Sequence, residues 1–309
     1  MRLLNLIMLS ILVLAMSCSA GGGTSSYSPY RGTKGLVFEF MDNAPPKFAY
    51  EGTDMPIALR IENQGATEIS DGVIIISSEK DRFIIDDPEI EVELTGKTLY
   101  NREGQKDVKT IFAEARGLDP QQETHTSTIS ATACYPYETV FTGEVCVDTD
   151  YKNLAGSNKA CTVRDLSSSG QGAPVVISRV EVEMLPSPDE RSVIPRFTVH
   201  VTNSGQGRIL DKTIVEDFCT ADIDERDEPF DVIHIKQAKL SNMYPLRCDS
   251  ARDQPGTVSL ARQGDTFFRC TYEQGIPLDE GAFTTPLIIT LEYGYTETIS
   301  TEIEIRAAR

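Results

Sequence analysis

The chain has 309 residues, of which 40% are hydrophobic, so it can form real cores and is not intrinsically disordered. Its 47 acidic and 29 basic residues give a net charge of -18, which repels phosphate backbones and argues against nucleic-acid binding. Acidity of this kind is most simply explained by solubility. Two more specific explanations of the acidity are a salty habitat and divalent cations bound at the surface.

The N-terminus has the features of an export signal over residues 1–18. Arg2 is followed by an apolar run to Met16 that is too short to span a bilayer comfortably. The end of this run resembles a lipoprotein processing site in which Cys18 is the lipidated residue. The usual pattern has Leu where Ala15 stands, so cleavage after Ala20 and an uncleaved anchor stay open as alternatives.

A tether is expected over residues 19–35, because this stretch is rich in Gly and Ser and includes the run Gly21-Gly22-Gly23. Such segments behave as flexible coil and hold a folded body away from its anchor. The protein is therefore expected on the outer face of the cell membrane or on the cell surface.

Beyond the tether, short strands are expected almost throughout, separated by Gly, Asn, Asp and Pro clusters. Apolar residues alternate at the inward positions Ile57, Leu59 and Ile61; Ile90, Val92 and Leu94; Val199 and Val201; Ile303 and Ile305. The solid apolar run 73–76 predicts a strand buried on both faces. Residues 108–115 are the best helix candidate, but the segment is short and Gly117 follows, so it is interpreted as a strand.

An internal repeat relates two parts of the chain at a constant offset of 140 residues. The pattern Ile57-x-Leu59-x-Ile61-x-Asn63-x-Gly65 matches Phe197-x-Val199-x-Val201-x-Asn203-x-Gly205, and Ile69, Asp71 and Ile74 match Ile209, Asp211 and Ile214. The pattern predicts a half-buried strand that runs into a turn, where Asn and Gly tolerate a left-handed backbone. A second, weaker similarity relates Cys134-Tyr135-Pro136-Tyr137 to Cys270-Thr271-Tyr272, and each segment precedes a late strand.

The repeat indicates two tandem immunoglobulin-like β-sandwich domains in an all-β chain. Residues 167–173 are small and polar and are interpreted as a linker. The first domain is placed at 36–166 and the second at 174–309.

The strand–Asn-x-Gly–strand repeat, the lipoprotein-like start and the spaced cysteines resemble archaeal and bacterial surface proteins with tandem immunoglobulin-like modules, called cell-adhesion-related domains. The resemblance implies the fold and the cell-surface location, and it implies adhesion or scaffolding more weakly. It transfers no binding residues. The sequence departs from true immunoglobulin domains because it contains no Trp, and Thr132 and Phe268 stand where a Tyr precedes the late cysteine.

The cysteines fit an exported protein. With Cys18 reserved for lipid, six remain, enough for three disulfides. The flexible loop 148–160 between them favours Cys146–Cys161, and a hairpin between 257–260 and 265–268 favours Cys248–Cys270. Cys134 and Cys219 are then left, either to join the two domains or to remain reduced, and the bridge is favoured.

Sites for chemistry are sparse. The acidic run 222–231 supplies Asp222, Asp224, Asp227 and Asp231 as calcium-ligand candidates, but it lacks the Gly of an EF-hand loop and contains Arg226. We therefore expect no metal and no cofactor, with calcium as the alternative; Asp86-Asp87 and Asp148-Thr149-Asp150 are weaker candidates. The three histidines, His125, His200 and His234, are scattered, and no Gly-x-Ser-x-Gly or His-Glu-x-x-His motif occurs.

The sequence therefore predicts a non-catalytic structural or adhesive module on the cell surface, held by an N-terminal membrane anchor. The first alternative is an extracellular module that binds carbohydrate or a partner protein, with Tyr135, Tyr137, Tyr293 and Tyr295 as an aromatic platform. The second is an extracellular hydrolase, which needs a polar pocket around a histidine. No Asn-x-Ser/Thr acceptor for N-glycosylation occurs.

Overall fold

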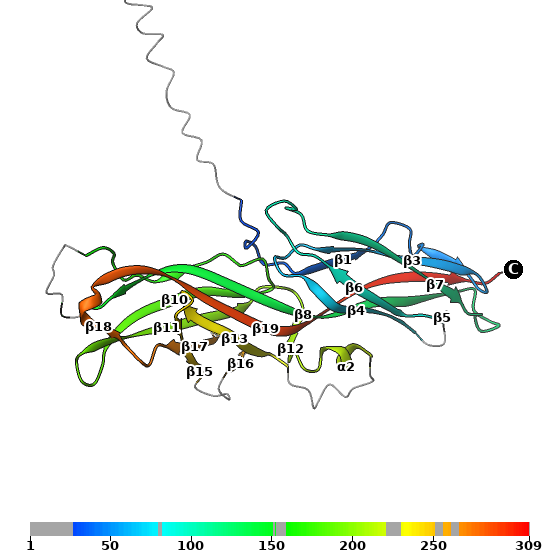
Figure 1. Cartoon of the computed structure of the whole chain (residues 1–309). Coiled ribbons are helices and arrows are strands. Elements are labelled where there is room, and N and C mark those ends of the chain that lie inside the picture. Colours follow the sequence, from blue (N-terminus) through cyan, green and yellow to red (C-terminus); the bar gives the residue numbers. More distant parts are fainter. Residues whose placement is uncertain are drawn as a thin grey trace, which may run out of the picture.

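The computed structural model describes residues 27–79, 82–150, 152, 159–220, 230–250, 256–260 and 266–308. Nearly all secondary structure in these ranges is β-strand, which confirms the expected all-β class. Two long strands, β8 (Thr124–Asp148) and β19 (Ala282–Arg306), run through both ends of an elongated body (Figure 1).

Three sheets build this body. The four-stranded sheet has the order β1 (Leu36–Phe40), β3 (Asp54–Asn63), β7 (Lys106–Ala115), β5 (Phe83–Ile85). The six-stranded sheet has the order β15 (Arg247–Asp249), β17 (Thr266–Thr271), β11 (Ser192–Asn203), β10 (Val175–Pro186), β9 (Leu166–Ser167), and β18 (Ile276–Pro277) also pairs with β11.

The nine-stranded sheet faces both of the others. Its order is β14 (Tyr244–Pro245), β13 (Val232–Leu240), β19, β8, β4 (Ile69–Ser78), β6 (Glu89–Leu94), with β12 (Arg208–Leu210) and β2 (Phe48–Tyr50) on β19 and β16 (Thr257–Ser259) on β13. We call the four-stranded sheet with the strands that face it the first lobe. The six-stranded sheet with the strands that face it is the second lobe. Figure 1 shows the two lobes end to end.

The strands form where the sequence alternates, because every second side chain of a strand points to the same face. Ile57, Leu59 and Ile61 of β3 are completely buried between the sheets. The expected strand at 108–115 is β7. In the run 73–76 the even positions Ile74 and Ile76 are buried, whereas Val73 and Ile75 are half-buried, so β4 is buried mainly on one face.

β8 and β19 pair antiparallel over 25 residues each, without a register shift. The pairing runs from Thr124 opposite Arg306 to Asp148 opposite Ala282, and Pro136 lies opposite Gly294 at its centre. The first half of β8 also pairs with β4, and the first half of β19 also pairs with β13. Each long strand therefore takes part in both lobes.

Pro136 occupies the middle of β8, although proline is disfavoured inside a sheet because it has no N–H. The pairing of β4 with β8 ends at Cys134, so β8 has no strand on that side at Pro136 within the described residues. The side-chain hydroxyl of Thr67 donates to the carbonyl of Glu138 on this same side. Since residues two apart face the same way, the missing N–H of Pro136 removes no hydrogen bond from the β8–β19 ladder.

The shared strands cross the boundary expected between two domains. The C-terminal part of β19 pairs with the first half of β8, and at Glu304–Arg306 it pairs in parallel with β2. The first lobe is therefore completed by the last strand of the chain. The division into domains at 36–166 and 174–309, and the number of immunoglobulin-like units, stay predictions.

The segment expected as a linker is packed into the body. Gln171 is 4% exposed and Ala173 is 1% exposed. This segment enters β10 at the centre of the molecule, between the two lobes, and its burial comes from contacts that a polar composition does not predict.

Two local expectations were wrong. A short helix, α2 (Val215–Thr220), lies between β12 and β13, where only strands and loops were expected. The backbone of Gly294 makes room for it, because a Cβ at that position would clash with the side chain of Val215. The expected hairpin between 257–260 and 265–268 does not form, since β16 pairs with β13 in the nine-stranded sheet and β17 pairs with β11 and β15 in the six-stranded sheet.

Candidate functional site: the junction of the two lobes

Four tyrosines meet where the lobes join. On β8, Tyr135 and Tyr137 lie directly opposite Tyr295 and Tyr293 of β19, and all four are at most 2% exposed. Their ring centroids lie 5.7 to 6.5 Å apart in tilted and edge-to-face arrangements. Aromatic pairs at these distances stabilise beyond the area they bury.

Each lobe supplies an asparagine to one of these tyrosines. In the first lobe the Tyr137 hydroxyl donates to the side-chain oxygen of Asn63 at 3.3 Å, and in the second the Tyr295 hydroxyl donates to Asn203 at 3.2 Å. These asparagines are the paired positions of the 140-residue repeat. The repeat is therefore a duplicated Asn–Tyr unit at the centre of the molecule.

The glycine of each Asn-x-Gly pattern is required by this unit. A Cβ on Gly65 would overlap the Tyr137 hydroxyl, and a Cβ on Gly205 would overlap the Tyr295 hydroxyl. Neither glycine has a positive φ angle. The expected reason, a left-handed turn backbone, was therefore wrong, and close approach of the tyrosine is the physical cause.

The other two tyrosines hold the first strand of each lobe. The backbone N–H of Leu36 donates to the Tyr135 hydroxyl at 3.3 Å, and the N–H of Val175 donates to the Tyr293 hydroxyl at 3.4 Å. Burial raises the pKa of both hydroxyls well above the usual value, and it raises the pKa of Tyr295 to about 12. All three stay neutral at physiological pH and act as hydrogen-bonding groups.

The burial of these tyrosines overturns two sequence expectations. Their ring faces are covered, so they do not form an exposed aromatic platform for carbohydrate. The proposed equivalence of residues 134–137 and 270–272 was also wrong. The counterpart of Tyr135–Tyr137 is Tyr293–Tyr295, whereas Cys270 lies in β17 of another sheet.

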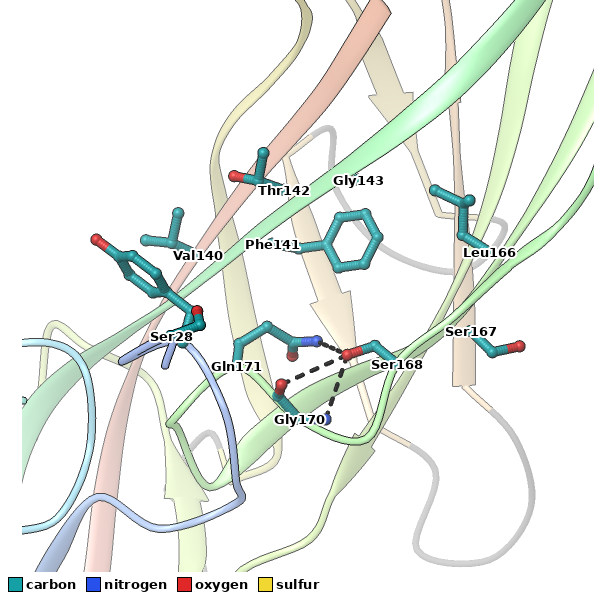
Figure 2. Close-up of a pocket in the computed structure, with 11 residues that line it drawn as sticks. Ser28, Val140, Phe141, Thr142, Gly143, Leu166, Ser167, Ser168, Gly170 and Gln171 are labelled. Atoms are coloured by element: carbon teal, nitrogen blue, oxygen red, sulfur yellow. Dashed lines mark hydrogen bonds between the residues drawn. The ribbon is translucent and has the colours of Figure 1, made fainter. Parts of the chain in front are cut away.

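A groove of about 300 Å³, the second-lobe groove, lies beside the junction (Figure 2). It is lined by Ser28, Tyr30, residues 140–143 of β8, residues 166–168, Gly170 and Gln171. Figure 2 shows the Phe141 ring and the Leu166 side chain over the segment where Gln171 and Ser168 are hydrogen-bonded. Gly143 makes room for Leu166, because a Cβ there would lie 2.6 Å from the Leu166 side chain.

Gln171 closes the edge of β10 inside this groove. Its side-chain nitrogen donates to the Ile177 carbonyl at 3.0 Å, and its side-chain oxygen accepts from the Ile177 N–H at 2.9 Å. The amide of Gln171 thus makes the two hydrogen bonds that a neighbouring strand would make. Next to it, β9 pairs with β10 through Leu166 and Ser167.

A larger groove of about 380 Å³, the first-lobe groove, lies beside β1. It is lined by residues 33–38, by Tyr135, Tyr295, Glu297 and Ile299, and by Pro174 and residues 204–206. Its charged residues are Lys34 and Glu297. Burial raises the pKa of the Glu297 carboxyl, and that carboxyl has no ion pair or hydrogen bond within the described ranges. Glu297 is a functional candidate that the sequence did not indicate.

The three histidines lie apart, and each one faces a single carboxylate. His125 lies 3.1 Å from Glu79, His200 lies 3.2 Å from Glu181, and His234 lies 3.0 Å from Asp211. None of them lines either of the two grooves at the junction.

The calcium candidates Asp222, Asp224 and Asp227 lie outside the described residues. Asp231 follows β-bridge residue Phe230 and has a positive φ of 63°. The carboxylates of the weaker candidates Asp148 and Asp150 form ion pairs with the ammonium group of Lys159, at 2.6 and 3.5 Å. No group of three metal-ligating side chains occurs among the residues that the structure describes.

Cys18 lies outside the described residues. In the part of the chain that the structure covers, no helix has the length and apolar character needed to cross a membrane.

Three disulfides join the other six cysteines. Cys146 is bonded to Cys161, and Cys248 is bonded to Cys270. Cys248 of β15 and Cys270 of β17 lie directly opposite each other in the pairing of these two strands. Cys134 of β8 is bonded to Cys219 of α2 across a sequence separation of 85 residues. Such bonds persist in oxidising surroundings, which indicates a protein outside the cytosol.

No family model matches the chain, and no curated protein matches it either. Among solved structures it is similar to the CupB6 tip adhesin from Pseudomonas aeruginosa, at 10% identity and a TM-score of 0.17, over 90% of this chain and 96% of that chain. A likeness this low carries no argument about function.

Proposed function

We propose that the protein is a non-catalytic structural or adhesive module, exported and presented on the cell surface by an anchor at Cys18. The observation that supports it most is the unbroken pairing of β8 with β19 through both lobes. A hinge between two domains needs a segment whose backbone can rotate without breaking hydrogen bonds. The pair of long strands has no such segment, so the two lobes act as one stiff body.

Two further contacts support a stiff body. The tyrosine junction is buried at the point where bending would occur, and packed interiors resist deformation. The Cys134–Cys219 disulfide fixes α2 to β8, beside β4 of the first lobe. A stiff spacer suits a module that holds a contact surface at a fixed distance from its partner.

The described chain begins near the middle of the body, and the two ends of the molecule point away from this place (Figure 1). The first described residue is held there, since the Tyr27 hydroxyl donates to the Arg102 carbonyl at 3.0 Å. A membrane anchor upstream of Tyr27 would leave both ends free for contacts with other surface components.

Small-angle X-ray scattering on residues 19–309 tests stiffness. The oxidised protein is expected to give one elongated particle whose maximum dimension does not change with salt or temperature below unfolding. Scattering that requires a mixture of bent and straight forms would contradict the proposal.

Surface presentation is tested by replacing Cys18 with Ser and fractionating the cells. The variant is expected to leave the membrane fraction, and retention at the original level would rule out lipidation. A pull-down from intact envelope, with and without a calcium chelator, then identifies surface partners and shows whether their binding needs calcium.

A further inference from the structure

The lobes can be compared residue by residue at their first strands. Leu36 of β1 pairs with Asn63, and Val175 of β10 pairs with Asn203, so Leu36 and Val175 are equivalent. Both donate their N–H to a junction tyrosine. Two residues further on, Phe38 is therefore equivalent to Ile177.

In the second lobe this strand edge is closed. The N–H and C=O of Ile177 are both bonded to the side-chain amide of Gln171, and β9 continues the pairing along β10. The hydroxyl of Thr139 donates to the Val175 carbonyl at 2.6 Å. The Phe141 ring is buried and lines the second-lobe groove.

In the first lobe the same edge is open. The N–H of Leu36 points away from β3 towards Tyr135, and residues two apart on a strand face the same side, so the N–H and C=O of Phe38 also point away from β3. β1 has no second neighbour within the described ranges. The first-lobe groove lies along this edge, and Phe38 is one of its lining residues.

The side chains that close the second lobe are changed in the first. Glu297 of β19 takes the place of Thr139, and the half-buried Ile299 takes the place of the buried Phe141, counted from the equivalent tyrosines. The groove therefore combines an unpaired strand edge, an apolar wall and the Glu297 carboxylate, which makes no ion pair within the described residues although Lys34 also lines the groove.

We propose that the first-lobe groove binds an extended peptide segment of a partner protein, which pairs antiparallel with β1 and places a basic side chain beside Glu297. Addition of a strand to an exposed edge is a common mode of peptide recognition. An extended peptide is the expected occupant because β9 and Gln171, which belong to one segment of this chain, fill the equivalent place in the second lobe. The basic side chain follows from charge complementarity to Glu297 and from the net charge of -18. This site does not depend on the anchor or on the stiffness proposed above.

The probes are three capped nine-residue peptides. One has the native sequence of residues 163–171, and the other two differ from it by Gln171→Lys or by Gln171→Glu at the last position. Binding to residues 19–309 is measured by fluorescence polarisation. The Lys peptide is expected to bind about three- to fivefold more tightly than the Gln peptide, since one screened ion pair contributes on this scale. The Glu peptide is expected to bind most weakly.

Three variants locate the site. Glu297→Gln is a conservative change at a half-exposed position and is expected to remove the preference for Lys over Glu. Glu302→Gln removes the same charge from an exposed position of the same strand and is expected to keep the preference. The double variant Glu297→Thr/Ile299→Phe gives the groove the side chains that the second lobe has at these positions. The larger ring at 299 is expected to fill the groove and abolish binding of all three peptides, with folding checked by circular dichroism.

Several results would overturn the proposal. They are the absence of saturable binding by any peptide at millimolar concentration, equal affinity for the Lys and Glu peptides, and unchanged binding by the folded double variant. Self-association of the wild-type protein that Ile299→Phe removes would assign the groove to a second copy of this chain and would overturn it as well.

Discussion

The two lobes share a framework but differ at one strand edge. Each has an Asn–Tyr unit and a tyrosine that holds its first strand. In the second lobe the edge of β10 is covered by β9, Gln171 and Phe141, whereas in the first lobe β1 borders an open groove. The comparison shows that two related halves can keep the same junction while one of them leaves a strand edge unpaired.

The largest effect is expected from the disulfide between Cys134 of β8 and Cys219 of α2. The double change Cys134→Ala/Cys219→Ala should lower the free energy of unfolding by about 4 kcal/mol, since a longer closed loop restricts the unfolded chain more. Removing Cys146–Cys161, with a separation of 15 residues against 85, should cost about 3 kcal/mol. Urea unfolding under oxidising conditions measures both, and the reverse order would contradict this account.

The two asparagines of the repeat are expected to differ. Asn63 is completely buried, and its side-chain amide takes part in four hydrogen bonds, with Thr67, Leu94, Gly65 and Tyr137. Its equivalent Asn203 is exposed, and water can replace its partners.

Asn63→Ala should therefore cost about 3 kcal/mol and Asn203→Ala about 1 kcal/mol. Thermal unfolding of the two single variants checks this, and equal losses would show that burial does not distinguish the two units.

Gln171→Ala should reopen the second-lobe edge, because it leaves the N–H and C=O of Ile177 without partners. A loss of about 1.5 kcal/mol is expected. The matched control is Gln206→Ala, an exposed residue of the first-lobe groove, for which a change below about 0.5 kcal/mol is expected. If both changes are neutral in urea unfolding, Gln171 does not close the edge.

The smallest effect concerns pH. Burial raises the folded-state pKa of Glu297 above its unfolded value, so the folded protein binds a proton that the unfolded chain releases. This group therefore lowers stability as pH rises through the interval between the two pKa values, and the loss persists above it. Glu297→Gln should flatten the stability–pH profile there and give a small gain in stability at neutral pH, as measured by urea unfolding at several pH values.

Much of the fold follows from the sequence, because alternation at positions such as Ile57 and Leu59 fixes which face of a strand is buried. The repeat located Asn63 and Asn203, and the Cys146–Cys161 disulfide coincides with the pairing that the flexible loop between these cysteines favoured. These features depend on local pattern or on short loops.

The rest depends on which strands become neighbours. Alternation near Ile303 predicts a strand but not that it pairs with β8 and β2 in the other lobe. Gln171 lies in a stretch whose small polar residues predicted a linker, and only its contact with Ile177 reveals its role. Glu297 is one of many acidic residues, and its position beside the open edge of β1 distinguishes it.

Amide hydrogen exchange at Phe38 and Ile177 tests the central comparison most directly, because these equivalent amides differ in whether they have a partner. Native-state exchange resolved to single residues is expected to show the Phe38 amide exchanging at least about tenfold faster than the Ile177 amide, and Gln171→Ala should bring Ile177 close to Phe38. Equal protection of the two amides in the wild-type protein would contradict an open edge in the first lobe.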